Sequence, residues 1–228
     1  MLIENRELFP FPGPAPIDSE AYAEDINEVA RIGVAESTER TSEQTATAIF
    51  WTVSASVPLN AAAKAASAAH QFDLVDNARL FALLNMTTHD ACIVVWGAKY
   101  DYDILRPETA IREAPTLGNP YIEHDPEWVS LLYSPAFGDY PSGHTGVVGA
   151  GVGVLQGIFD SDEVEVSVVW PSPGQGVWRK YESFLAIEEE VIEARIWAGA
   201  HTRKADVDAA RVGHEIADYV LAKFMQPM

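Results

Sequence analysis

Three short segments of the chain carry positively charged, hydroxyl and imidazole side chains. They run from Lys99 to Arg106, from Pro141 to His144, and from Arg195 to His201. In the second segment Pro141 disfavours a helix before it and Ser142 can cap a helix after it, so His144 is expected in a first helical turn. A first turn presents unpaired N–H groups and the positive end of the helix dipole, which attract an anion. Taken alone, this segment favours a capped helix with an incidental histidine over an anion site.

Each of these residues has an ordinary explanation when it is considered singly. Lys99 would end a helix, where a lysine complements the dipole, and Arg106 could pair with one of the many acids. His201 would cap a helix C-terminus if that helix breaks at Gly199. Together the segments supply two guanidinium groups, an ammonium, a hydroxyl, a glycine N–H and two imidazoles: Lys99, Arg106, Ser142, Gly143, His144, Arg195 and His201. Such a set fits a tetrahedral oxyanion whose oxygens are held by the donors, with one imidazole bonding the central atom and the other exchanging protons.

The order and spacing of the segments resemble a known family signature. Lys-x6-Arg-Pro, then Pro-Ser-Gly-His, then Arg-x5-His is shared by the vanadium-dependent haloperoxidases and the type 2 phosphatidic acid phosphatase superfamily. The flanking stretches HDACIVVWGAKYDYDILRPETAIRE and ARIWAGAHTRKADVDAARVGHEIADYVL look like bacterial haloperoxidases rather than lipid phosphatases. The resemblance covers roughly residues 10–224. It implies an all-α helical bundle of the acid phosphatase and vanadium haloperoxidase type.

The resemblance also implies a cofactor and a role for each residue. Vanadate would be the cofactor, with phosphate able to substitute, and hydrogen peroxide and halide would be the substrates. His201 would be the covalent ligand of vanadium, and His144 the acid–base residue that helps peroxide bind. The oxygens of vanadate would be held by Lys99, Arg106, Ser142, Gly143 and Arg195. The vanadate would act as a Lewis acid, while the protein supplies charge neutralisation and geometry.

Two aromatic positions and one acidic position extend the resemblance. Trp96 and Phe137 match places where fungal chloroperoxidases carry aromatic residues, which implies a halide pocket; both rings could equally pack a core. The family often has a serine before the last arginine and an aspartate four residues after the ligand histidine. This chain has Ala194 and Ala205 at those places, and Asp206 follows one position later. Asp206 is therefore the candidate for orienting the ligand histidine.

Two other functions fit the same residues. A phosphatase would use His201 to attack phosphorus and His144 to protonate the leaving group. Vanadate and phosphate are so similar in shape that the residues around the anion do not separate the two reactions. A non-catalytic oxyanion-binding or assembly protein would keep the fold, but the presence of both histidines counts against it.

Composition limits the partners of the protein and its location. The net charge of −19 over 228 residues argues against nucleic acid and anionic membranes, which would repel the chain. No basic start followed by an apolar run is present, so no signal peptide is expected and the cytoplasm is favoured. No apolar stretch reaches the ~18 residues of a membrane span. The single Cys92 cannot form an intramolecular disulfide and is expected in the core.

The elements that must position the site follow from periodicity and from helix-breaking residues. Residues 1–17 are expected to be an extended lead-in, and residues 18–228 a single helical domain. The expected helices are 19–36, 41–56, 60–71, 74–102, 142–159, 179–200 and 206–224, with a short β segment near 164–170. Residues 103–140 contain five prolines and should form a long functional loop. The apolar helix 19–36 and the alanine-rich helix 60–71 need partners, which favours a homodimer or larger assembly.

Overall fold

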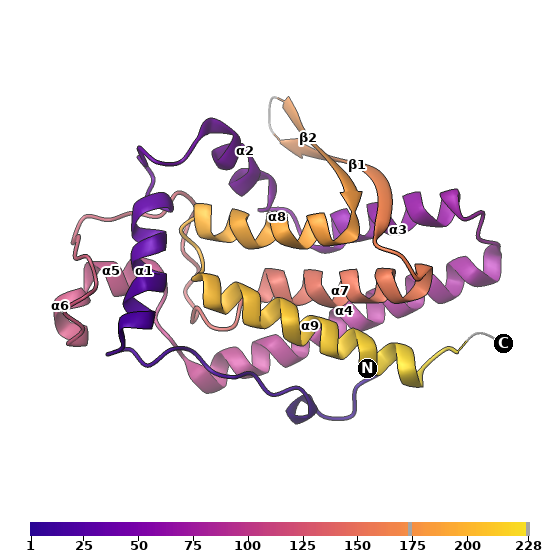
Figure 1. The fold of residues 1–228 in the computed structure, drawn as a ribbon, viewed down its shortest axis with the longest axis horizontal. Helices are drawn as coiled ribbons and strands as arrows, with labels where there is room; N and C mark the ends of the chain where they lie inside the picture. The colour runs from indigo at the N-terminus through magenta and orange to yellow at the C-terminus, as the bar shows by residue number, and fades with distance from the viewer. Residues whose placement is uncertain (173–174, 227–228) are drawn as a thin grey trace.

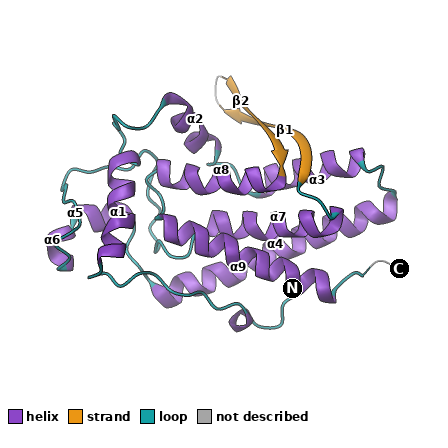
Figure 2. Ribbon diagram, in the orientation of Figure 1, coloured by secondary structure: helices purple, strands orange, loops and turns teal. Residues whose placement is uncertain are grey.

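The computed structural model describes residues 1–172 and 175–226. Its elements are η1 (Arg6–Leu8), α1 (Glu20–Ile32), α2 (Ser42–Phe50), α3 (Ser56–Ala69), α4 (Leu74–Tyr102), α5 (Pro107–Arg112), α6 (Ala114–Leu117), α7 (Gly143–Phe159), β1 (Glu163–Ser172), β2 (Gln175–Ser183), α8 (Phe184–Trp197) and α9 (Arg203–Lys223). The long helices α4, α7, α8 and α9 lie side by side, and α1 crosses one end of the bundle (Figure 1). Within the described residues, strand occurs only in the β1–β2 hairpin (Figure 2). The predicted all-α bundle with a minor β element is confirmed.

α7 is the central helix of the bundle and packs against α4, α8 and α9. Its sequence, GHTGVVGAGVGVLQGIF, contains six glycines, each less favourable in a helix than alanine by about 1 kcal/mol. Tertiary packing rather than intrinsic propensity must therefore hold this helix. The missing side chains let α9 approach closely: a Cβ on Gly213 would lie 2.5 Å from the carbonyl oxygen of Gly146 and 2.6 Å from the amide nitrogen of Ala150.

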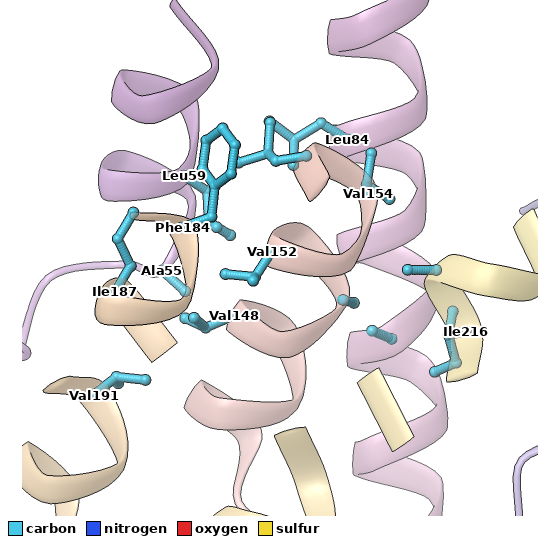
Figure 3. Close-up of a cluster of buried hydrophobic side chains, with 14 of the residues drawn as sticks. Ala55, Leu59, Leu84, Val148, Val152, Val154, Phe184, Ile187, Val191 and Ile216 are labelled. Atoms are coloured by element: carbon cyan, nitrogen blue, oxygen red, sulfur yellow. The ribbon is translucent and has the colours of Figure 1, made fainter. Parts of the chain in front are cut away.

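The main hydrophobic core fills the space between α7 and its neighbours. Leu59 of α3, Leu84 of α4 and Phe184 of α8 surround Val152 of α7 in Figure 3. None of these four side chains has exposed surface. Because fully burying one such side chain stabilises the fold by about 1.5–3 kcal/mol, this core fixes the helices, and hence their ends, relative to one another.

A second apolar cluster holds the long loop between α4 and α7 in place. Ile26 of α1 packs with Ile111 of α5 and with Trp128 of the loop. The indole Nε1 of Trp128 also donates a hydrogen bond of 2.9 Å to the carbonyl oxygen of Ala30. The loop is therefore packed against the body of the protein, which fixes the position of Arg106 at its start.

The segment before α1 contributes to the main core as well. Ile3, Phe9 and Phe11 are buried there, and the backbone amides of Leu2 and Ile3 both donate to the buried carboxylate of Asp90. The segment before α1 thus packs along α4 and forms part of the main core. A domain boundary after residue 17 stays a prediction.

Several expected helix boundaries are wrong, and two of these differences have a clear physical reason. The expected helix 60–71 begins at Ser56, because Pro58 lies in the first turn, where its missing N–H loses no helical partner. The expected helix 179–200 begins at Phe184, because residues 175–183 pair with β1 as a second strand. The helices expected to end at residues 36 and 56 end at Ile32 and Phe50. The prediction for 74–102 is confirmed at both ends.

The helices that were expected to need an outside partner find partners within the chain. α3 packs against β1, α4 and α7, and α1 packs against α5 and α8. This removes the argument for an oligomer, and the oligomeric state stays a prediction. The segment Leu74–Arg112 is long and apolar enough to cross a membrane, but half of its most apolar window is buried inside the bundle, as in a core helix. The absence of a membrane partner likewise stays a prediction.

Replacing Gly213 by alanine should destabilise the fold by about 1–3 kcal/mol, because the new methyl group would overlap the backbone of α7. The matched control is Gly157→Ala in α7, where a Cβ would meet only the end of the flexible Leu221 side chain. That change should leave stability unaltered or raise it by up to about 1 kcal/mol. Urea unfolding followed by circular dichroism measures both, and equal midpoints would refute the close α7–α9 contact.

Candidate active site

The candidate residues lie where the ends of several elements meet. Lys99 belongs to the last turn of α4, Arg106 immediately precedes α5, and Arg195 belongs to the last turn of α8. Ser142 is the N-cap residue of α7, and His201 lies in the short turn between α8 and α9. In Figure 1 the C-termini of α4 and α8 and the N-termini of α7 and α9 all point to the end of the bundle next to α1. The core that fixes these helices therefore also fixes the site.

The structure brings the predicted residues together at one cavity of about 420 Å³. Its lining includes Lys99, Arg106, Gly143, His144, Arg195 and His201, together with Trp96 and Phe137. The backbone amide of Ser142 donates a hydrogen bond of 2.9 Å to the carbonyl oxygen of Ala205, which ties the start of α7 to the start of α9. The Ser142 side chain itself is fully buried beside the cavity.

His201 is held as a neutral imidazole with one defined tautomer. Its Nδ1 lies 2.7 Å from Oδ1 of Asp139. The other oxygen of Asp139 accepts from the hydroxyl of Thr202 at 2.7 Å and faces its backbone N–H. Nη1 of Arg106 can only donate and lies 3.2 Å from Nε2 of His201, so Nε2 is unprotonated and the proton of the neutral ring is on Nδ1. Burial and the neighbouring cations lower the pKa of His201 well below its usual value, so Nε2 keeps a lone pair that faces the cavity side.

The orienting role predicted for Asp206 is wrong. Asp206 is fully buried in the first turn of α9, where its Oδ1 lies 3.4 Å from the hydroxyl of Thr145, and its neighbouring charge is Arg195. Asp139 takes the orienting position instead, from the long loop three residues before Ser142. An acidic residue so close to the Pro-Ser-Gly-His segment was a signal in the sequence, but only the fold shows that it reaches His201.

Lys99 and Arg106 are both buried, and both donate hydrogen bonds to backbone carbonyl oxygens. The ammonium of Lys99 donates to the carbonyl oxygens of Gly138 at 3.0 Å and Asp139 at 2.9 Å. Burial, with a contribution from Arg106, lowers the pKa of Lys99 to about 7. Arg106 donates from Nε to the carbonyl oxygen of Phe137 and from Nη1 to that of Ala200, each at 2.6 Å. Its Nη1 also lies 3.2 Å from Nε2 of His201.

Four buried polar atoms at this site have no hydrogen-bond partner within the described part of the chain. They are the donors Nη2 of Arg106, Oγ of Ser142 and Nε of Arg195, and the acceptor Oδ2 of Asp206. A buried donor without a partner costs about 1–3 kcal/mol or more when it is charged, so a ligand with several acceptor oxygens would stabilise this arrangement. Ser142 was expected to cap α7 with its side chain, but it makes no cap hydrogen bond. Its hydroxyl instead lies close to the carboxylate of Asp206, whose pKa it lowers.

His144 is the second neutral imidazole. Its Nε2 lies 3.2 Å from the carbonyl oxygen of Val53, which can only accept, so Nε2 carries the proton and Nδ1 is an acceptor. Burial, followed by the charge of Arg195, lowers the pKa of His144 to about 4. At neutral pH this residue is therefore uncharged, with a lone pair on Nδ1.

The predicted halide-pocket residues form an aromatic wall beside the cations. The ring centroids of Trp96 and Phe137 are 4.6 Å apart at an angle of 58°. The guanidinium carbon of Arg106 lies 4.8 Å from the Phe137 centroid, and the Lys99 nitrogen lies 5.6 Å from it, within range of cation–π attraction. Both rings are half-buried and line the cavity. Cys92, expected in the core, is half-buried and lines the same cavity.

Comparison with known proteins finds one matching family model and one relative of known function. A family model described as the VCPO second helical-bundle domain matches residues 79–228. The vanadium chloroperoxidase of Curvularia inaequalis is 36% identical over 86 residues, which are 33% of this chain and 13% of that protein. The match to the curated relative is thus confined to a small part of it.

Solved structures with the same fold are about twice as long as this chain. The crystal structure of a bacterial vanadium-dependent iodoperoxidase has a TM-score of 0.82 at 24% identity, covering 98% of this chain and 55% of that one. The holo-type structure of a bacterial vanadium-dependent chloroperoxidase has a TM-score of 0.77 at 19% identity, covering 96% and 51%. These likenesses establish the fold, and the chain spans about half of each structure.

Removing the carboxylate of Asp139 should change the tautomer of His201. In the wild-type protein the ¹⁵N signals should show a protonated Nδ1 and a bare Nε2, because Asp139 accepts from Nδ1. In Asp139→Ala the Nε2-protonated form should become substantial. Asp139→Asn should shift the tautomer in the same direction, because an amide whose oxygen accepts from Thr202 presents an NH2 donor to Nδ1. Asp206→Asn is the matched control and should leave it unchanged. A tautomer change in the control alone would assign the orienting role to Asp206 after all.

Oxyanion affinity should fall as the pH rises through about 7. Lys99 loses its proton near this pH in the anion-free protein, and a bound anion favours the protonated form, so binding above pH 7 should take up a proton. Sulfate is the suitable probe because its own charge stays constant in this range. Calorimetry in two buffers of different ionisation enthalpy measures the uptake, which Lys99→Met should abolish. Proton uptake that persists in Lys99→Met would show that another group is responsible.

Proposed function

The chain belongs to the family of the VCPO second helical-bundle domain, and we propose that it carries the active site of a vanadate-dependent haloperoxidase, which oxidises halide with hydrogen peroxide. One observation carries this proposal. Arg106 and Arg195, which each have a buried, unpartnered donor, line the cavity together with the neutral imidazole of His201. A tetrahedral oxyanion is the ligand whose oxygens satisfy these donors, and vanadate is such an anion.

Vanadate fits the donor set without any change of residue type. The unpaired Nη2 of Arg106, Nε of Arg195 and Oγ of Ser142 would donate to its oxygens, and the ammonium of Lys99 would neutralise charge. A Cβ placed on Gly143 would find only the Trp96 indole nitrogen nearby, at 3.9 Å, so space exists at the start of α7. The N-terminal end of that helix adds a positive dipole.

His201 would supply the bond to vanadium. A metal ligand must present a lone pair, and the Nδ1–H···Asp139 hydrogen bond leaves Nε2 of His201 in that state. Nη1 of Arg106 lies 3.2 Å from this nitrogen.

His144 would move the proton. Bound vanadate supplies a Lewis acid that activates hydrogen peroxide towards attack by halide. The pKa of His144 near 4 leaves it unprotonated at neutral pH, so its Nδ1 can accept the proton that hydrogen peroxide loses on binding. The aromatic wall of Trp96 and Phe137, close to Lys99 and Arg106, would provide an apolar, positively polarised place for a halide ion.

A phosphatase on the same scaffold is the competing proposal. The unpartnered donors suit phosphate equally, and His201 would then attack phosphorus. The matches to the VCPO family model and to a vanadium chloroperoxidase support the peroxidase. A non-catalytic oxyanion-binding protein would need no second imidazole in the cavity.

Vanadate titration of halide-dependent peroxide consumption tests the proposal. The wild-type protein should show saturable activity, and phosphate should raise the vanadate midpoint competitively because both anions use the same donors. His201→Ala should lose vanadate binding by more than 100-fold, since a covalent ligand is removed. His144→Ala should keep the vanadate midpoint within a few-fold and lose ~10²–10⁴-fold in kcat. The control is His124→Ala, which should behave as wild type. His124 is an exposed loop residue whose ring is hydrogen-bonded to the backbone carbonyl oxygen of Arg112.

Two results would contradict the proposal. Equal losses of vanadate affinity in His201→Ala and His144→Ala would refute the separate roles of the imidazoles. Release of phosphate from an aryl phosphate at neutral pH, without any halide-dependent peroxide consumption after vanadate loading, would favour the phosphatase.

A further inference from the structure

Tyr140 lies between two residues of the candidate site, but its side chain is buried away from the cavity. Its neighbour Asp139 orients His201, and Ser142 is the N-cap residue of α7 two positions later. The described lining of the cavity does not include Tyr140, only 1% of the residue is exposed, and it belongs to the main hydrophobic core. Contact with a ligand in the cavity therefore does not explain why a tyrosine occupies this position.

The hydroxyl of Tyr140 joins three segments of the chain. It donates a hydrogen bond of 2.8 Å to the carboxylate of Asp208 in α9 and accepts one of 3.1 Å from the backbone N–H of Gly13. Burial and the hydrogen bond to Asp208 raise the pKa of the phenol, so it keeps the proton that it donates. The same carboxylate oxygen of Asp208 accepts from the ammonium of Lys204 at 2.9 Å. One hydroxyl thus links the loop before α7 to α9 and to the N-terminal segment, residues 1–17.

The sequence of the N-terminal segment favours one fixed position for the N–H of Gly13. Prolines occupy every second position from 10 to 16, and each has a fixed φ and no N–H. Gly13 has a φ of +89°, a conformation that residues with a side chain rarely adopt. A Cβ at Gly13 would also lie 3.4 Å from the ring of Tyr102. A rigid, close-packed segment therefore presents this donor to Tyr140.

Two aromatic rings hold the ring of Tyr140 in place. The ring centroid of Tyr102 lies 5.1 Å away at an interplanar angle of 87°, and that of Phe11 lies 6.1 Å away at 78°. Both arrangements are edge-to-face, which aromatic pairs favour. The hydroxyl of Tyr102 also donates to the carbonyl oxygen of Phe11 at 3.0 Å. The hydroxyl and the ring of Tyr140 are therefore both fixed.

Fixing Tyr140 also fixes the atoms on either side of it that serve the site. The carbonyl oxygen of Asp139 accepts from the ammonium of Lys99, and its carboxylate accepts from Nδ1 of His201. On the other side, the backbone N–H of Ser142 donates to a carbonyl oxygen of α9. Hydrogen bonds weaken steeply when their distances and angles depart from the optimum. A small displacement of Tyr140 would therefore reach the ammonium, the imidazole and the start of α7.

We propose that Tyr140 is a positioning residue of the oxyanion site, which fixes the loop carrying Asp139 and Ser142 through its hydrogen bonds to Asp208 and Gly13. Its effect on anion binding rests on the proposed function, whereas its effect on the imidazole of His201 does not. A phenol both donates and accepts, so one side chain bridges a carboxylate and a backbone N–H across the core. Phenylalanine would fill the same space without either hydrogen bond.

Two measurements on Tyr140→Phe test this role without any catalysis. Calorimetry below pH 7 gives the affinity for sulfate, which should fall at least fivefold because the donors around the anion lose their alignment. NMR of ¹⁵N-histidine-labelled protein gives the exchange of the Nδ1 proton of His201 with water, which should become at least fivefold faster as the contact with Asp139 loosens. The matched control is Tyr102→Phe, which removes a hydrogen bond to the N-terminal segment from the same aromatic cluster. It should change neither quantity by more than twofold.

Substitutions of Asp208 test the same role from the side of α9. One carboxylate oxygen accepts from both Tyr140 and Lys204, so the amide oxygen of Asp208→Asn can replace it, and both quantities should stay within twofold of wild type. Asp208→Ala should reproduce the losses of Tyr140→Phe. Combining these two changes should add no more than twofold to either loss, because both remove the same hydrogen bond. The Asp208 variants also keep the test valid if Tyr140→Phe does not fold.

The outcomes separate this role from the proposed function. A change of less than fivefold in sulfate affinity or in proton exchange at His201, in folded Tyr140→Phe or in Asp208→Ala, would overturn the role of Tyr140 and leave the proposed function standing. Equal losses in Tyr102→Phe would also overturn it, because they would show a general loosening of the core. If the wild-type protein binds no sulfate, the oxyanion site itself fails, and proton exchange at His201 still decides the role of Tyr140.

Discussion

Three buried cations that share one cavity set the conditions for the rest of the structure. Moving a charged group out of water costs several kcal/mol unless hydrogen bonds and opposite charges compensate it. Much of this compensation comes from backbone: Lys99 donates to two carbonyl oxygens of the long loop, and Arg106 to one of that loop and one of the α8–α9 turn. Loop and turn must therefore be held as firmly as the helices. The second apolar cluster around Trp128 holds the loop, and Ala198 and Ala200 of the turn pack with Ala48 of α2.

The two carboxylates of the site lie behind the cavity and do not line it. Asp139 and Asp206 are both buried, and burial raises the pKa of each. Asp139 is committed to His201 and Thr202, so the side facing the cavity stays positive. An anionic ligand would neutralise the positive charge of Lys99, Arg106 and Arg195 at the cavity. This is why the same cavity combines unpaired donors, neutral imidazoles and a lysine of lowered pKa.

Sequence reasoning succeeded where a pattern is local and failed where contacts are distant. The extent of α4 follows from a sustained apolar period. The three motif segments are recognised by the spacing of their residues. Residues 179–183 of β2 were taken for the start of a helix, because the pairing with β1 that makes them extended is not visible in the local sequence. Asp139 was missed for the same reason, since the spacing of Asp206 after His201 pointed elsewhere, and no local pattern shows a contact across 62 residues.

The most direct test of this account is a crystal structure of the protein soaked with orthovanadate at near-neutral pH. The account predicts vanadium density bonded to Nε2 of His201, with the vanadate oxygens within hydrogen-bond distance of Arg106 Nη2, Arg195 Nε and Ser142 Oγ, the atoms that lack partners in the anion-free protein. Vanadate bound elsewhere, or an unchanged cavity at millimolar vanadate with Arg106 still against His201, would contradict it.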